Sequence, residues 1–191
     1  TVVHSLLLAN RTTLEHVLVP ALPPDVAIPM ACPRLRSLGF RLREMEDATN
    51  AEPVLKHCAS RPLERLEVFC AAEPEGGLPF PFQRFTLLAA ATLPQTLRVL
   101  RLQVPIPEDC MQLLGSVLDR VPSLEELTLY LSGHVPFPFL RTLWSAFRKL
   151  PLLREVHLRE WTTGDLAVAP EVLSETVEMW ALASLASVCM F

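Results

Sequence analysis

The adjacent residues His57 and Cys58 have the types needed for a thiol nucleophile and its general base. Consecutive residues of a helix point about 100° apart, so adjacency alone does not place the imidazole against the thiol. The pair Gly115-Ser116 lacks the flanking glycine of a nucleophile elbow and lies inside a helical pattern. We therefore predict that neither pair is catalytic and that the chain has no enzymatic activity of its own.

Two pairs of acids, Glu125-Glu126 and Glu73/Glu75, have the side chains required for general acid–base chemistry. Glu125 and Glu126 fall on exposed positions of a predicted strand, where charged side chains are expected in any case. We therefore interpret the acid pairs as parts of a solvated surface. The 6 glycines form no phosphate-binding loop, and tightly spaced metal ligands are absent from the sequence. We predict no catalytic residue, no cofactor and no metal.

Bulk composition limits the class of partner and the compartment. The formal net charge is −4 and Lys and Arg are not clustered, which argues against a nucleic-acid partner. The 5 cysteines are scattered without a CxxC pair, so we expect buried thiols in an intracellular protein of the cytoplasm or nucleus. The longest charge-free apolar run, Met179–Phe191, has 13 residues. A membrane span needs about 20, so we predict no membrane partner.

Six segments share the spacing apolar-x-x-apolar-x-apolar, and their first residues lie 21, 28, 34, 27 and 29 residues apart. The six segments are Leu14–Val19, Leu35–Phe40, Leu63–Val68, Leu97–Leu102, Leu124–Leu129 and Leu153–Leu158. We number each unit from its first apolar residue, so that the other two are positions 4 and 6. Apolar residues at alternate positions are typical of a short strand with one buried face. A series of such segments indicates a repeat architecture.

Proline precedes most of the six segments at a similar offset, as at Pro33, Pro122 and Pro151. Because proline cannot continue a helix, it marks where a helix ends and the next strand begins. The helical pattern between strands is clearest from Pro107 to Val121 and from Pro138 to Leu150. We also predict shorter or less regular helices, which span residues 2–8, 52–58 and 81–91.

Strands that alternate with helices at 27 to 34 residues per unit predict an α/β leucine-rich-repeat solenoid of about six irregular repeats. We expect parallel strands on the concave face of an arc and helices on its convex face. The repeat array should occupy residues 1–160. Residues 161–191 should form a turn and then a helix from Pro170, apolar on all sides between Trp180 and Phe191. This helix caps the last repeat or packs on another chain.

Three segments in particular, Cys32–Leu38, Val121–Leu129 and Leu150–Leu158, resemble the repeats of F-box leucine-rich-repeat proteins. The uneven repeat lengths and abundant proline are similar to the F-box-like proteins of fungi, with ribonuclease-inhibitor-like repeats. The resemblance covers roughly Leu14 to Leu158. It implies that the repeats bind protein targets of a ubiquitin ligase, as a substrate adaptor whose F-box binds the cullin-type ligase adaptor.

No F-box is seen in this chain. The segment Leu22–Val26 resembles an F-box opening, but a predicted strand follows it instead of two more helices. The chain begins with Thr1 and not with Met, so we expect the natural N-terminus, and any F-box, to lie upstream. Two alternatives stay open: a structural or regulatory leucine-rich-repeat interaction protein with no ubiquitin link, and a hydrolase embedded in a repeat scaffold.

Positions 3, 5 and 7 of each unit should point to the concave face, because positions 4 and 6 point into the core. Neighbouring strands would align each position in a row, with about 4.8 Å between strands. Aromatic residues and arginine, which commonly anchor interfaces, occur in these rows. We predict that a protein target binds a surface formed by Arg41, Phe69, Arg101, Tyr130 and Arg159. The alternative is an ordinary polar strand face with two incidental aromatics.

Overall fold

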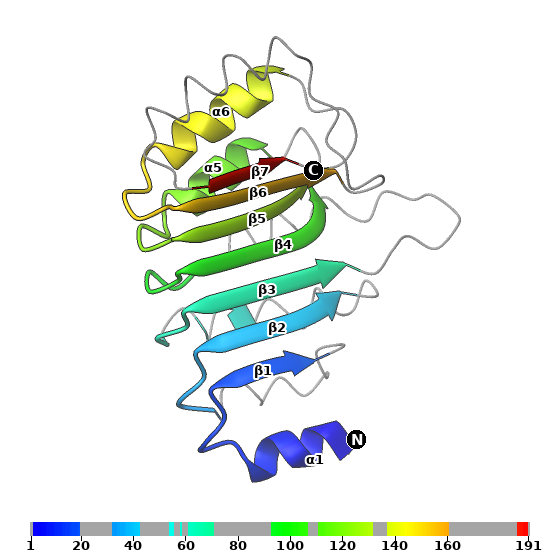
Figure 1. Cartoon of the computed structure of the whole chain (residues 1–191). Helices are drawn as coiled ribbons and strands as arrows, with labels where there is room; N and C mark the ends of the chain where they lie inside the picture. Colours follow the sequence, from blue (N-terminus) through cyan, green and yellow to red (C-terminus); the bar gives the residue numbers. More distant parts are fainter. Residues whose placement is uncertain are drawn as a thin grey trace, which may run out of the picture.

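The computed structural model describes residues 2–19, 32–42, 54–55, 58, 61–70, 93–106, 111–131, 137–160 and 187–190. In this part of the chain, seven strands form one sheet, and each strand pairs in parallel with the next strand along the chain (Figure 1). The strands are β1 (His16–Val19), β2 (Ser37–Leu42), β3 (Arg65–Cys70), β4 (Val99–Ile106), β5 (Glu126–Leu131), β6 (Glu155–Glu160) and β7 (Ser187–Met190). The chain is therefore an α/β protein with an all-parallel sheet.

The six strands predicted from the repeat pattern are all present, and they pair in the predicted register at positions 4 and 6. Position 4 of one unit lies beside position 4 of the next, so that Leu38 pairs with Leu66 and Leu66 with Leu100. The same alignment continues through Leu127 to Val156. The units differ in length, but equivalent residues of neighbouring units pair in the sheet. This pairing confirms the prediction of parallel strands stacked in chain order.

Alternate strand residues build the core, as the spacing predicts. In β3, Leu66 and Val68 are 1% and 0% exposed, and Glu67 between them is only half-buried. These side chains belong to one buried cluster with helix residues such as Leu114 and Trp144. Helices α5 and α6 therefore cover the sheet face that bears positions 4 and 6. We call the opposite face, which bears positions 3, 5 and 7, the outward face.

The described helices lie where the sequence pattern predicts them, although at least one end of each helix differs from the prediction. The described helices are α1 (Val2–Ala9), α5 (Met111–Leu118) and α6 (Phe137–Phe147), and α5 and α6 contact each other beside the C-terminal strands (Figure 1). Within the short helix predicted at residues 52–58, the described residues Val54, Leu55 and Cys58 are helical and buried. The residues at the start of the predicted Pro107 helix and the whole predicted helix at 81–91 lie outside the described residues.

A tight turn before the strands explains the recurring prolines. The N–H of Leu124 donates a hydrogen bond to the C=O of Val121 at 3.1 Å, and Pro122 occupies the second position of this turn. Equivalent turns place Pro33 and Pro151 in the same position. Proline is favoured there because its fixed φ already has the value that the turn requires. Each of these three prolines therefore ends the preceding segment and also shapes the entry into the next strand.

The residue at position 2 links each unit to the next. The carbonyl of Arg36 accepts hydrogen bonds from the N–H groups of Glu64 at 2.7 Å and Arg65 at 3.0 Å, and the same pair of bonds recurs between the other units. Position 2 alternates between acid and arginine along the chain: Glu15, Arg36, Glu64, Arg98, Glu125 and Arg154. Arg36 pairs with Glu64 at 3.0 Å and Arg98 with Glu125 at 2.8 Å. Each of these ion pairs at the surface contributes at most about 1 kcal/mol to stability. The alternation of acid and arginine nevertheless favours the order in which the units stack.

The helix predicted between Trp180 and Phe191 is wrong at Ser187–Met190, which form strand β7. This strand extends the sheet, with Val188 beside Val156 of β6. The sheet therefore continues past the boundary predicted at residue 160. The sequence pattern could not distinguish the two structures, because a wholly apolar run has neither helical nor strand periodicity. The turn predicted after Trp161 and the start of the helix at Pro170 lie outside the described residues.

Candidate partner-binding face

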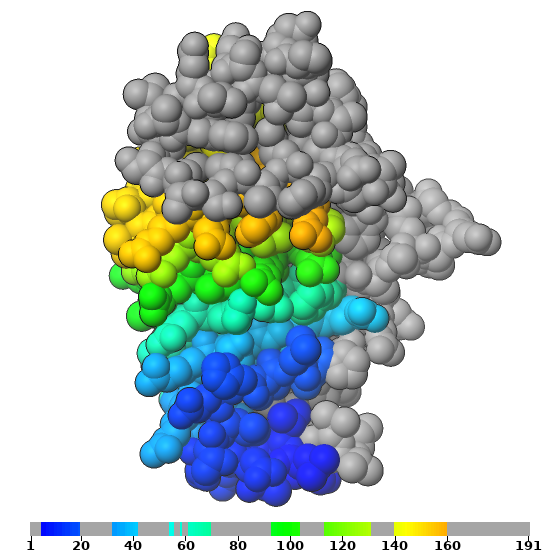
Figure 2. All heavy atoms as spheres, in the orientation of Figure 1, coloured from blue at the N-terminus to red at the C-terminus, as the bar shows by residue number. Residues whose placement is uncertain are grey.

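The five residues predicted to bind a partner all lie on the outward face of the sheet, as two neighbouring pairs with Arg101 between them. Arg41 on β2 is beside Phe69 on β3, and Tyr130 on β5 is beside Arg159 on β6. Arg101 lies between them on β4, at position 5. Arg41 and Arg159 are exposed, and the other three are half-buried. In the space-filling view β1 to β6 appear as successive bands of colour in chain order (Figure 2).

An irregularity in β4 separates the two groups. Leu102 pairs with Leu129, but the next residue of β5, Tyr130, pairs with Pro105. Gln103 and Val104 are therefore extra residues on β4, as in a β-bulge. The prediction that position 7 aligns Gln103 with Tyr130 is wrong for this reason. Proline has no N–H to donate to a neighbouring strand, so a break in the ladder is most easily accommodated near Pro105.

Arg101 belongs to a network of ion pairs that crosses three strands. Its Nε and Nη2 donate to Glu126 Oε1 at 3.0 and 2.6 Å, and its Nη1 donates to Glu67 Oε1 at 3.5 Å. Arg65 Nε lies 2.8 Å from the same Glu67 oxygen, although its buried N–H is not aligned for a hydrogen bond. Two arginines thus balance two carboxylates. Arg101 therefore offers less free charge to a partner than its residue type indicates.

Tyr130 and Arg159 form a pair that joins an aromatic ring to a cation. Arg159 Nη1 donates to the Tyr130 hydroxyl at 3.3 Å. The guanidinium carbon lies 6.0 Å from the centre of the Tyr130 ring, at the outer limit of a cation–π contact. Each of these two side chains restricts the rotamers of the other. Binding of a partner would therefore cost less side-chain entropy at this pair than at two independent side chains.

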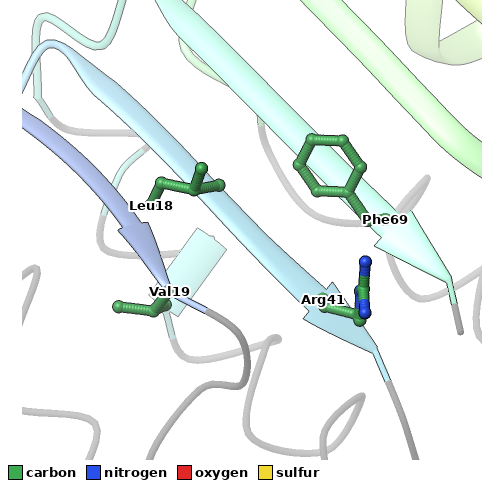
Figure 3. Close-up of a pocket in the computed structure, with 4 residues that line it drawn as sticks. All are labelled: Leu18, Val19, Arg41 and Phe69. Carbon is green, nitrogen blue, oxygen red and sulfur yellow. The ribbon is translucent and has the colours of Figure 1, made fainter.

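Leu18 and Gly39 add a feature that the predicted set of residues omits. A Cβ built on Gly39 would lie 2.6 Å from Leu18 Cδ1 and 3.7 Å from Phe69 Cε2. Leu18 therefore reaches over β2 into the space that a side chain at residue 39 would fill, as Figure 3 shows. The hollow beside it has a volume of about 420 Å³ and is lined by Leu18, Val19, Arg41 and Phe69.

A signal for this hollow exists in the sequence. Leu18 and Gly39 both occupy position 5, so the repeat alignment places a large apolar residue beside a glycine on the outward face. A search of the outward positions for aromatic residues and arginine alone does not find a leucine beside a glycine.

The thiol of Cys58 is buried, with 1% of the residue exposed. Burial raises the pKa of this thiol to about 12, and the nearby charge of Arg61 offsets part of the effect. Burial also raises the pKa of Cys32. Both thiols stay protonated near neutral pH, and a protonated thiol is a poor nucleophile. Cys32 and Cys58 are free and buried, as predicted; the side chains of the other three cysteines, and His57, lie outside the described residues.

The other residues considered for catalysis lie in ion pairs, in a helix or outside the described residues. Glu125 and Glu126 are each paired with an arginine, at 2.8 and 2.6 Å. Ser116 is an exposed residue within α5, as the helical pattern predicts. Glu73 and Glu75 lie outside the described residues. Among the residues with described positions, no group of three or more His, Cys, Asp or Glu side chains could hold a metal ion.

Comparison with known proteins does not assign the chain to a family. No protein-family model matches it, and no curated protein matches its sequence significantly. No helix in the described ranges is long and apolar enough to cross a membrane. The class of the chain is therefore defined by its fold: an α/β protein with an all-parallel sheet, helices on one face and an outward face that bears polar and aromatic side chains.

Proposed function

We propose that the chain is a leucine-rich-repeat solenoid that recognises another protein through the outward face of its sheet. The observation that carries this proposal is the placement of Arg41, Phe69, Tyr130 and Arg159 on one face that the described helices leave uncovered. Arginine and aromatic residues are over-represented among the residues that dominate binding energy at protein interfaces. The repeated turns and strands, with helices α5 and α6 after β4 and β5, support the solenoid, because such units bury their apolar faces only by stacking.

We further propose that the repeats form the target-binding region of an F-box-like ubiquitin-ligase substrate adaptor. This part of the proposal rests on the resemblance of the turn and strand segments, such as Val121–Leu129 and Leu150–Leu158, to F-box leucine-rich-repeat proteins. The F-box that binds the cullin-type ligase adaptor would lie upstream of Thr1. The repeats of this chain would then contact the protein to be ubiquitinated and not the ligase itself.

Affinity capture of the full-length protein, followed by mass spectrometry, tests the ligase link. We expect the ligase adaptor among the captured proteins, and we expect its loss when the segment upstream of Thr1 is deleted. Target proteins should remain bound to the truncated chain. Capture of binding proteins without the ligase adaptor would instead favour a structural or regulatory repeat protein with no ubiquitin link.

A further inference from the structure

The hollow lies on the outward face and is lined by residues of β1, β2 and β3. Gly39 lies between Leu18 and Glu67 in the sheet register, and its missing Cβ leaves room for Leu18 to reach toward Phe69 (Figure 3). Leu18 is nevertheless 73% exposed. Large apolar side chains on two strands therefore flank a space of about 420 Å³ that is open to solvent, a volume within the range of about 300–1,000 Å³ found for binding pockets.

The charge beside this hollow is positive. Arg41 lines it, is exposed and has no ion-pair partner among the described residues. The other cations nearby on the outward face differ, because Arg65 and Arg101 are both paired with Glu67. Among the described arginines of β2, β3 and β4, the one whose charge remains available to a ligand is thus Arg41, which adjoins the apolar hollow.

We propose that the hollow binds an apolar side chain of a peptide segment in the target protein, and that Arg41 binds a carboxylate next to it. The target segment therefore has leucine or a similarly large apolar residue followed or preceded closely by Asp or Glu. The exposure of Leu18 favours a side chain presented by a protein over an enclosed small molecule. This inference rests on the proposed function, and it places the apolar part of the recognition surface on β1 and β3.

A peptide-library experiment tests the proposed chemistry directly. The full chain is immobilised and incubated with short synthetic peptides that have a fixed central leucine and randomised flanks. A second library has alanine at the central position. We expect retention of the leucine library with Asp and Glu enriched beside the leucine, and about tenfold weaker retention of the alanine library.

Two charge-reversal variants separate a specific contact from general electrostatics. Arg41→Glu should replace the preference for Asp and Glu with a preference for Lys and Arg. Arg141→Glu changes the net charge equally at an exposed residue of α6 and should leave the preference for acids unchanged. Equal retention of the two libraries, or an acid preference that Arg41→Glu does not alter, would overturn the proposal.

Filling the hollow provides a second measurement. Gly39→Leu should displace Leu18, because its Cβ would lie 2.6 Å from Leu18 Cδ1, and should therefore abolish the difference between the leucine and alanine libraries. Phe69→Ala, which removes one wall, should weaken retention of the leucine library about tenfold even if Gly39→Leu does not fold. Retention unchanged in the folded variants contradicts the proposal. If Tyr130→Ala abolishes capture of a protein partner while the libraries show no preference, the proposed function stands and this inference fails.

Discussion

Leu18 and Leu38 lie on neighbouring strands but on opposite faces of the sheet: Leu18 is 73% exposed and Leu38 is 1% exposed. Leu38 occupies position 4 and belongs to the buried cluster, whereas Leu18 occupies position 5 and faces outward. The same residue type therefore has two roles that differ only in the parity of its strand position.

These two leucines provide a matched test of the fold. Leu38→Ala should lower the free energy of unfolding by about 2–5 kcal/mol, because it leaves a cavity in a packed core. Leu18→Ala should change it by no more than about 0.5 kcal/mol, because the side chain is already solvated. Chemical denaturation of the two variants measures both values. Equal losses would contradict the assignment of the two faces.

The ion pair between Arg101 and Glu126 should show a measurable but small coupling. The Arg101 side chain is 34% exposed and that of Glu126 is 20% exposed, so solvent screens much of the attraction. A double-mutant cycle with Arg101→Met and Glu126→Gln should give a coupling of about 0.5–1 kcal/mol in denaturation experiments. High salt should reduce this coupling. A coupling of zero at low salt would show that the network does not hold Arg101 in place.

Cys58 should make stability fall at alkaline pH. Its pKa in the folded chain is about 12, compared with about 8.5 for an unperturbed thiol. Above the lower value the unfolded chain loses a proton that the folded chain retains, so the free energy of unfolding declines as pH rises toward 12. The expected slope reaches about 1.4 kcal/mol per pH unit.

Denaturation at several pH values, with Cys58→Ala as the comparison, measures this contribution. The variant should lose less stability than the unchanged chain between about pH 8.5 and 10. Curves that run parallel over this interval would contradict a raised pKa. Iodoacetamide provides a control that does not depend on stability: Cys58 should be modified slowly in the folded chain and rapidly after unfolding.

Much of the sheet could be predicted because its buried residues recur at fixed positions. Leucine, valine and one phenylalanine at positions 4 and 6 predict six of the strands, their direction and almost all of their register. The pattern depends on burial, which acts on every unit in the same way. Strand β7 was missed because it lies in a run of apolar residues without alternation.

The candidate site was less predictable because it depends on relations between strands. Two extra residues on β4 place Tyr130 beside Pro105, and a repeat pattern read from positions 1 to 6 does not detect an insertion after position 6. The pairing of Arg101 with Glu67 and Glu126 likewise depends on side-chain distances and not on residue type. The absence of a side chain at Gly39 allows Leu18 to reach over β2 and line the hollow, and a search for aromatic residues and arginine alone does not find this feature.

Capture of a protein partner by surface variants of the full chain tests the central claim most directly. Arg41→Ala, Phe69→Ala and Tyr130→Ala should each reduce the partner recovered by about tenfold, with melting temperatures close to that of the unchanged chain. Arg141→Ala, at an exposed residue of α6, should recover the partner fully. If the three outward-face variants recover the same partner as the unchanged chain and Arg141→Ala does not, the outward face is not the recognition surface.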